Sequence, residues 1–316
     1  MNNPVVSALL PVVLLISVGF VAGRAGWIRA EAIKDLSNLV FMVLTPALLF
    51  RTMSTVHVEQ LNFKPVAMYF VAALLLFGAM LFWQGANRHA AVLALAATFS
   101  NTVMIGIPLI GLAYGQTGLV TLFTLISVHA LVLLTLATVV LEMVVAREER
   151  ASGQGGQRNM AMTVLAAVKS GIIHPVPLPI IVGLLFAQTG LVLPEVVDKP
   201  LHLLGTAFGP VALVLVGVTL TQVQVGQNLK SALGISLLKN LALPGMVAAL
   251  GLGLGMSGLP LTVMIVAASL PTGANVFLFS QRYEVAQDLV TATMAVSTVL
   301  GLASITLVMS LVGLLA

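Results

Sequence analysis

The sequence predicts an all-α polytopic membrane protein with about ten transmembrane helices. Of its 316 residues, 59% are hydrophobic and only 8% are charged, whereas a typical soluble domain has about 25% charged residues. Apolar runs long enough to span a bilayer as a helix recur from one end of the chain to the other. Two of these runs contain a cluster of helix-breaking polar residues near the centre, which is costly in a membrane interior.

Ten candidate spans result when the chain is cut at charged or Gly/Pro-rich junctions. They cover roughly 5–24, 35–54, 64–84, 90–114, 118–145, 161–188, 200–222, 231–256, 260–281 and 286–314. The N-terminal run lacks a basic segment and is long for a signal peptide, so we expect it to be retained as the first span. The stretch REERASGQGGQRN at 147–159 is typical of a flexible loop. We therefore predict a five-helix repeat at 1–147, a loop at 148–160 and a second five-helix repeat at 161–316.

The distribution of Lys and Arg predicts the orientation of the chain. Nine of these residues fall in loops on the side of the polar loop, and three fall on the opposite side. The nine are Arg24, Arg29, Lys34, Arg88, Arg147, Arg150, Arg158, Lys230 and Arg282, and the three are Arg51, Lys64 and Lys199. Because basic loops stay in the cytoplasm, we expect a multi-pass inner-membrane protein with a cytoplasmic 147–159 loop and both termini outside. The net charge of +4 follows from this orientation and does not indicate nucleic-acid binding.

Prolines and glycines repeat between the two halves at a constant spacing. Pro11, Gly19, Gly26 and Pro46 each have an identical residue 164 positions later, at Pro175, Gly183, Gly190 and Pro210. Five spans in each half give the two halves opposite orientations. Inverted repeats with helix breaks at corresponding positions are typical of secondary transporters and indicate where the binding site lies.

Each half also contains a polar break inside an apolar span. Span four contains SNTVMIGIP at 100–108, and span nine contains ASLPTGANVFLFS at 268–280. A break near the midplane frees N–H groups, which favour an anion, and carbonyl groups, which favour a cation. We predict a binding site where the two breaks cross. Its substrate-binding candidates are Ser100, Asn101, Thr102, Pro271, Thr272, Gly273 and Asn275, with Pro46 and Pro210 in the lining that faces them.

Titratable side chains are scarce in the predicted membrane interior. None of the ten acidic residues falls near the midplane, which argues against a carboxylate-based cation site and favours an organic anion. Lys239 lies inside span eight, and we interpret it as snorkelling to the cytoplasmic interface, with attraction of an anion as the alternative. His129 in span five is interpreted as bonded to a neighbouring carbonyl rather than as a proton carrier.

The sequence contains no pattern that indicates catalysis. It has no cysteine, no His/Asp/Glu cluster with metal-ligand spacing, and no G-x-S-x-G motif with an acid and a histidine nearby. We therefore expect a protein that is not an enzyme and that has neither a cofactor nor a metal site.

Four segments resemble the auxin efflux carrier family, which includes plant PIN carriers and bacterial permeases for malonate and similar organic acids. They are FSNTVMIGIPL at 99–109, KSGIIHPVPLPIIVG at 169–183, LLKNLALPGM at 237–246 and SLPTGANVFLFSQRY at 269–283. The resemblance implies the crossover fold shared with bile-acid symporters and the NhaA antiporter. Spans 1, 2, 6 and 7 would form a scaffold, through which the protein would dimerise. Spans 3–5 and 8–10 would form a transport domain that moves like an elevator.

The resemblance also assigns roles to residues at the breaks. Members of the family commonly have Pro-Asn at the first break, and the asparagine contacts the substrate carboxylate. Asn101 matches that asparagine, whereas Ser100 stands where proline is usual. Pro271 matches the proline of the second break.

Together these features predict a secondary active transporter of a small organic anion, a mono- or dicarboxylate such as malonate. It would work in the lipid bilayer by alternating access of the elevator type. Because no nucleotide-binding motif is present, we expect an ion gradient to drive transport, with H⁺ or Na⁺ as the coupling ion. The alternative is a sodium-coupled symporter of the bile-acid type, with Na⁺ held by oxygens at the crossover.

Overall fold

The computed structural model describes residues 4–151, 160–173, 175–223 and 226–313. Within these residues the regular secondary structure is helical, and the one extended pairing is an isolated antiparallel bridge between Ser100 and Thr272. The predicted all-α class is confirmed. Most of the predicted loop at 148–160 falls on residues 152–159, which lie outside the described part of the chain.

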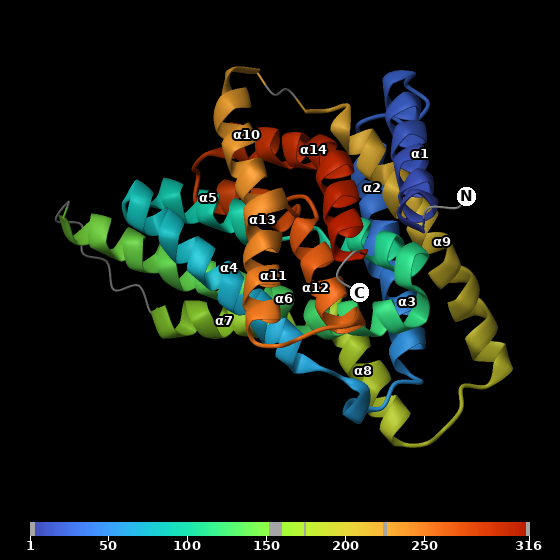
Figure 1. Cartoon of the computed structure of the whole chain (residues 1–316). Helices are drawn as coiled ribbons and strands as arrows, with labels where there is room; N and C mark the ends of the chain where they lie inside the picture. The colour runs from blue at the N-terminus through green and yellow to red at the C-terminus, as the bar shows by residue number, and fades with distance from the viewer. Residues whose placement is uncertain (1–3, 152–159, 174, 224–225, 314–316) are drawn as a thin grey trace.

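The first half of the chain contains six α-helices and three short π- or 3-10 turns, which are labelled η (Figure 1). They are α1 Pro4–Arg24, α2 Ala32–Leu39, η1 Val40–Leu44, α3 Thr45–Met53, η2 Val58–Gln60, α4 Phe63–Gln84, α5 Arg88–Thr98, η3 Thr102–Gly106 and α6 Ile107–Ala151. Within α6, Gly115 has non-helical angles of φ 60° and ψ −153°. The long α6 is therefore two helices that meet at the junction predicted between spans four and five.

The described residues of the second half contain eight α-helices and two η turns. They are α7 Met160–Ile172, α8 Pro177–Gln188, α9 Glu195–Leu220, η4 Gly226–Asn228, α10 Leu229–Leu237, η5 Leu238–Ala242, α11 Leu243–Gly253, α12 Leu259–Ser269, α13 Asn275–Arg282 and α14 Gln287–Gly313. The prediction of one continuous helix over 161–188 is wrong, because α7 and α8 are separate. Pro175, Pro177 and Pro179 explain the interruption, since each proline lacks the N–H needed to continue a helix.

Seven helices in the described residues are long and apolar enough to cross a membrane, compared with ten predicted spans. They are Val5–Arg24, Ala32–Met53, Phe63–Gln84, Thr102–Arg150, Glu195–Leu220, Leu229–Gly253 and Gln287–Gly313. The predicted spans 90–114, 161–188 and 260–281 are missing because each is divided into shorter helices. By length and composition the chain is a multi-pass membrane protein.

Three of the helices contain a π-helical turn, and a proline follows each turn by two positions. The turns η1, η3 and η5 precede Pro46, Pro108 and Pro244. A proline inside a helix displaces the carbonyl four residues before it. The wider turn has hydrogen bonds between residues five apart, such as Gly106 N–H to Asn101 C=O at 3.1 Å. π-turns often occur at functional sites, and η3 and η5 both contribute to the site described below.

The helices form two groups (Figure 1). α1, α3, α8 and α9 pack on one another, α4, α5, α10, α11, α12 and α14 pack on one another, and α6 contacts both groups. Glycines allow close backbone contact in the first group. A Cβ on Gly19 would collide with Val214 O, and a Cβ on Gly183 would lie 2.8 Å from Phe50 O. Gly183 follows Gly19, and Val214 follows Phe50, by the same 164 positions.

Candidate functional site at the crossing of two helix breaks

Two helical runs are interrupted at polar segments. Residues 99–101 separate α5 from η3, and residues 270–274 separate α12 from α13. Within these segments, Ser100 and Thr272 lie opposite each other in the antiparallel bridge. Water cannot satisfy freed backbone groups in a membrane interior, so pairing the two breaks with each other stabilises both.

Two backbone hydrogen bonds flank the bridge. Asn101 N–H donates to Pro271 C=O at 2.8 Å, and Gly273 N–H donates to Phe99 C=O at 2.9 Å. A Cβ on Gly273 would lie 2.9 Å from the Phe99 ring, so the crossing requires glycine at this position. These freed backbone groups are therefore used to join the two breaks.

Thr272 joins the crossing to two further helices. Its Oγ1 donates to Ala96 C=O in α5 at 2.8 Å, and its N–H donates to Ser297 Oγ in α14 at 3.1 Å. The residue is only 2% exposed. Thr272 therefore stabilises the crossing from within the protein.

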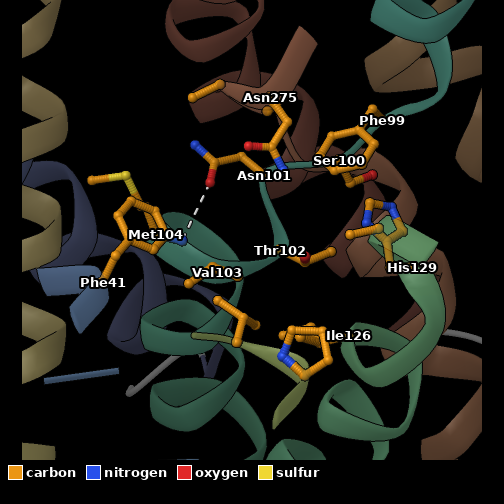
Figure 2. A pocket seen from close by; sticks show the side chains of 15 residues that line it. Phe41, Phe99, Ser100, Asn101, Thr102, Val103, Met104, Ile126, His129 and Asn275 are labelled. Carbon is orange, nitrogen blue, oxygen red and sulfur yellow. Dashed lines mark hydrogen bonds between the residues drawn. The ribbon is translucent and has the colours of Figure 1, made fainter. Parts of the chain in front are cut away.

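A small cavity of ≈ 70 Å³ lies beside the first break (Figure 2). It is lined by Phe41, Phe99, Ser100, Asn101, Thr102, Val103, Met104, Ile126, His129, Ala130, Val176, Pro177, Gly273, Ala274 and Asn275. Five of the predicted substrate-binding residues are in this set, namely Ser100, Asn101, Thr102, Gly273 and Asn275. Pro46, Pro210, Pro271 and Thr272 are outside it.

Asn101 presents an unpaired donor at this cavity. Its Oδ1 accepts a hydrogen bond from Met104 N–H at 3.2 Å and caps the start of η3 (Figure 2). Its Nδ2 has no hydrogen-bond partner in the described residues. The side chain of Asn275, at the start of α13, has none there either. Amide N–H groups suit a ligand that accepts hydrogen bonds.

A buried hydrogen-bonded chain borders the same cavity. The Tyr69 hydroxyl lies 2.8 Å from Ser100 Oγ and 3.1 Å from His129 Nε2. The His129 ring also packs against Phe99, with ring centroids 4.5 Å apart. The interpretation of His129 as bonded to a carbonyl is wrong, because its hydrogen-bond partner is Tyr69. Tyr69 was not identified from sequence, although it is the only hydroxyl side chain in the predicted span 64–84.

Lys239 occupies a different place from the one predicted. It is fully buried, and its Nζ donates to Ala268 C=O at 2.6 Å and to Leu270 C=O at 2.7 Å. The interpretation that it snorkels to the interface is therefore wrong. The reason is that the carbonyls at the end of α12 offer a closer partner than water does.

A second cavity of ≈ 530 Å³ lies between the first group of helices and α6. It is lined by Pro11, Leu15, Leu48, Arg51, Thr52, Ile107, Pro108, Gly111, Leu112, Gln116, Leu119, His202, Gly205, Thr206, Phe208, Gly209, Pro210 and Leu213. Pro210 thus lines this larger cavity, whereas Pro46 lines neither of the two.

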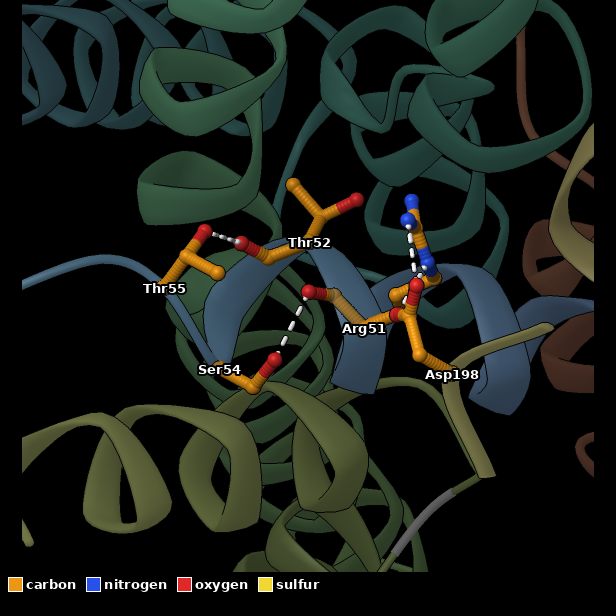
Figure 3. A network of polar contacts seen from close by, with 5 residues as sticks. All are labelled: Arg51, Thr52, Ser54, Thr55 and Asp198. Carbon is orange, nitrogen blue, oxygen red and sulfur yellow. Dashed lines mark hydrogen bonds and ion pairs between the residues drawn. The ribbon is translucent and has the colours of Figure 1, made fainter. Parts of the chain in front are cut away.

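An ion pair fixes the edge of the larger cavity (Figure 3). Arg51 Nε donates to Asp198 Oδ1 at 2.7 Å, and Nη2 donates to Oδ2 at 3.0 Å. This two-pronged pair joins α3 to the start of α9. Ser54 and Thr55 close the end of α3 by donating to the carbonyls of Arg51 and Thr52, at 2.8 and 3.2 Å.

The small cavity offers polar groups without a carboxylate. No Asp or Glu is among its lining residues. Groups of three or more His, Cys, Asp or Glu that could hold a metal ion are absent from the part of the chain described. The cavity can therefore bind a small polar ligand through hydrogen bonds, and it favours a ligand that accepts them.

Comparison with known proteins identifies the family. The family described as "Membrane transport protein" matches residues 4–309. The chain belongs to this family of membrane transporters. The resemblance to auxin efflux carriers is confirmed, because an "Auxin efflux carrier component 8" from Arabidopsis thaliana is 21% identical over 334 residues, covering 90% of this chain and 91% of that protein.

Two bacterial relatives are also similar over nearly their whole length. A "Putative malonate transporter" from Rhizobium meliloti (strain 1021) is 26% identical over 306 residues, covering 94% of this chain and 92% of that protein. An "Uncharacterized transporter YfdV" from Escherichia coli (strain K12) is 24% identical over 300 residues, covering 92% and 91%. Membership of this transporter family is consistent with a protein that is not an enzyme.

Proposed function

We propose that the chain is a secondary active transporter of a small organic anion, a mono- or dicarboxylate such as malonate. The observation that carries this proposal is the small cavity at the crossing, where Asn101 and Asn275 offer unpaired amide groups and no acidic side chain is present. A buried carboxylate is costly unless it accepts hydrogen bonds, and these side chains supply donors. The relative named for malonate supports a short dicarboxylate.

The size of the cavity supports a short acid. A volume of ≈ 70 Å³ accommodates a handful of heavy atoms. Phe41, Phe99, Ile126 and Met104 form apolar walls around the polar groups. Such walls would contact the carbon chain of an acid and would disfavour a bare inorganic ion, which has no apolar surface.

The proposed mechanism is alternating access of the elevator type. We assign α1–α3 and α7–α9 to the scaffold, and α4–α6 and α10–α14 to the transport domain. The paired contacts of Gly19 with Val214 and of Gly183 with Phe50 support an inverted repeat, because a shift of 164 positions exchanges one contact for the other. The larger cavity offers an approach path between the two units, with Arg51 at its edge.

Orientation and assembly complete the proposal. The basic loops favour an inner-membrane protein with the 147–159 loop in the cytoplasm and both termini outside. Assembly as a homodimer through the scaffold helices follows from the resemblance to plant members of the family. Chemical labelling of single cysteines from one side of the membrane tests the orientation, since the natural chain has no cysteine to interfere.

Uptake of radiolabelled malonate into proteoliposomes tests the proposed function. We expect uptake by the purified chain, and we expect short carboxylates to raise its thermal unfolding midpoint because they bind only the folded state. Competition among mono- and dicarboxylates of increasing length would then identify the preferred acid. If no short carboxylate is transported or stabilises the protein, the organic-anion assignment is wrong.

A further inference from the structure

The end of α12 presents free carbonyl groups inside the protein. The last four carbonyls of any α-helix have no partner within the helix, and they form the negative end of its dipole. α12 ends at Ser269, and the next residue, Leu270, is extended with φ −62° and ψ 151°. Because the surroundings contain no bulk water, these carbonyls need either a donor or a cation.

Lys239, in a neighbouring helical run, donates hydrogen bonds to these carbonyls. The turn η5 places its ammonium group 2.6 Å from Ala268 O and 2.7 Å from Leu270 O. These distances are as short as hydrogen bonds from a charged donor usually are. Two carbonyls on either side of the helix end are thus held by a single side chain.

The charge of Lys239 has no acidic counterpart among the residues described. The ion pairs in that part of the chain involve other residues, such as Arg51 with Asp198 and Arg88 with Glu148. Compensation for the buried charge must therefore come from carbonyl oxygens and from the negative end of α12. This is the environment that binds a monovalent metal cation in transporters with broken helices.

A third oxygen belongs to the next residue in the sequence, Asn240. Asn240 Nδ2 donates to Ser297 C=O at 2.7 Å, whereas its Oδ1 is buried without a hydrogen-bond partner in the described residues. The Ser297 hydroxyl in turn accepts from Thr272 N–H. The turn that carries Lys239 therefore also holds a buried oxygen without a hydrogen-bond donor in the described residues.

We propose that Lys239 fills a monovalent-cation site at the end of α12 as a tethered cation. Lys239 then supplies the positive charge that a bound metal cation supplies in other transporters. The stability of the protein therefore does not depend on Na⁺. The transport part of this inference rests on the proposed function, and it opposes the sodium-coupled alternative. When Lys239 is removed, the carbonyls of Ala268 and Leu270 become ligands for a cation from the buffer.

Thermal unfolding of the full chain in choline, Na⁺, Li⁺ or K⁺ chloride at equal ionic strength tests this inference. For the natural protein we expect the same midpoint in all four salts, within about 1 °C. Lys239→Ala should unfold about 5–10 °C lower in choline. At least one of the metal cations should raise the midpoint of Lys239→Ala by about 3 °C or more. Lys230→Ala is the matched control, because Lys230 is exposed in the adjoining α10 and should show neither effect.

Three results would overturn the inference. One is stabilisation of the natural protein by Na⁺ over choline, since its cation position should already be filled. Another is a folded Lys239→Ala variant that no metal cation stabilises. The third is a Lys239→Gln variant with unchanged stability and no response to cations. Glutamine keeps hydrogen-bond donors without the charge, so this result would show that the charge has no role. If Lys239→Ala cannot be purified, Lys239→Gln and the natural protein still decide the question.

Transport measurements separate this inference from the proposed function. Uptake of malonate by the natural protein should be the same with Na⁺ or choline outside. If no carboxylate is transported but Lys239→Ala gains cation-dependent stability, the proposed function fails and the cation site stands. If uptake by the natural protein requires Na⁺, the tethered-cation inference fails and the transporter assignment stands.

Discussion

The two helix breaks satisfy freed backbone groups in different ways. The first break uses an uncharged side chain, since Asn101 Oδ1 accepts from Met104 N–H at the start of η3. The second break uses the buried ammonium of Lys239 at the end of α12. Both breaks border the small cavity, the first with Phe99, Ser100 and Asn101 and the second with Gly273 and Ala274. Pro271 and Thr272 of the second break are buried outside that cavity.

The two breaks therefore differ in how they are held in place, although both contribute to the cavity. Two short hydrogen bonds from Lys239 hold the backbone of the second break in place. Because the bridge joins the two breaks, it also holds the backbone of the first break. The first break can therefore leave Asn101 Nδ2 unpaired at the cavity. A site that is positioned by rigid neighbours binds with a smaller loss of conformational entropy.

The largest effect is expected for Asn101→Ala, because it removes the free donor of the first break. A hydrogen bond to a charged acceptor contributes about 1.5–3 kcal/mol, so malonate uptake should fall roughly 10- to 150-fold. Stability should fall by only about 1 kcal/mol, the usual contribution of an N-cap. Proteoliposome uptake and the thermal midpoint, measured on the same preparation, check both parts.

Asn87→Ala is the matched control for that variant. Asn87 caps α5 by accepting from Ala90 N–H at 2.8 Å, and it lines neither cavity. It should show the same loss of stability with unchanged uptake. Equal loss of uptake in both variants would mean that Asn101 acts only as a cap.

Gly273→Ala should be next, since it forces a methyl group against the bridge. The added Cβ would meet the Phe99 ring at 2.9 Å and Ser100 O at 3.2 Å. Overpacking of this kind costs about 1–3 kcal/mol, which lowers a thermal midpoint by several degrees. Gly253→Ala, where an added Cβ meets nothing within 4 Å, is the control and should not lower the midpoint. A midpoint for Gly273→Ala equal to that of the control would show that the crossing is loosely packed.

Thr272→Val tests whether the second break has a supporting role. It removes the bond to Ala96 C=O while nearly keeping the shape of the side chain, and it leaves a buried acceptor without its partner. We expect a loss of about 1–2 kcal/mol in stability and at most a few-fold change in uptake per folded molecule. A large loss of uptake at normal stability would instead place Thr272 in contact with the substrate.

The smallest effect is expected for Tyr69→Phe, which removes the hydroxyl shared by Ser100 and His129. A buried hydrogen bond contributes about 1 kcal/mol, so uptake should fall about fivefold and the midpoint by a few degrees. Tyr114→Phe is the control, because the Tyr114 hydroxyl has no hydrogen-bond partner in the described residues. No change in Tyr69→Phe would show that this chain of bonds is not used.

The sequence allowed prediction of the all-α class and the position of both polar segments. Proline, glycine and asparagine inside a long apolar run are costly in lipid, so their presence at 99–102 and 270–275 stands out from composition alone. Five of nine predicted site residues line the small cavity for this reason. The constant spacing of glycines likewise pointed to positions such as Gly19 and Gly183, which lie at close helix contacts.

The missed features depend on contacts between distant segments. Lys239 could reach the interface or an interior acceptor, and only the folded position of Ala268 and Leu270 decides between them. His129 lies in α6 and its hydrogen-bond partner Tyr69 lies in α4, so neither residue reveals the other in the sequence. The break between α7 and α8 is different, because three prolines between 175 and 179 mark it in the sequence itself.

The bridge between the breaks also constrains how the protein is made. Beside the bridge, a hydrogen bond joins Thr272 to Ala96, and these two residues are 176 positions apart in the chain. At about 5–20 residues per second, a ribosome needs roughly 10–35 s to add that length. Throughout this interval the first break is already synthesised while its partner does not yet exist. The nascent chain must therefore keep a polar, unpaired segment near water or within the insertion machinery until its last third arrives.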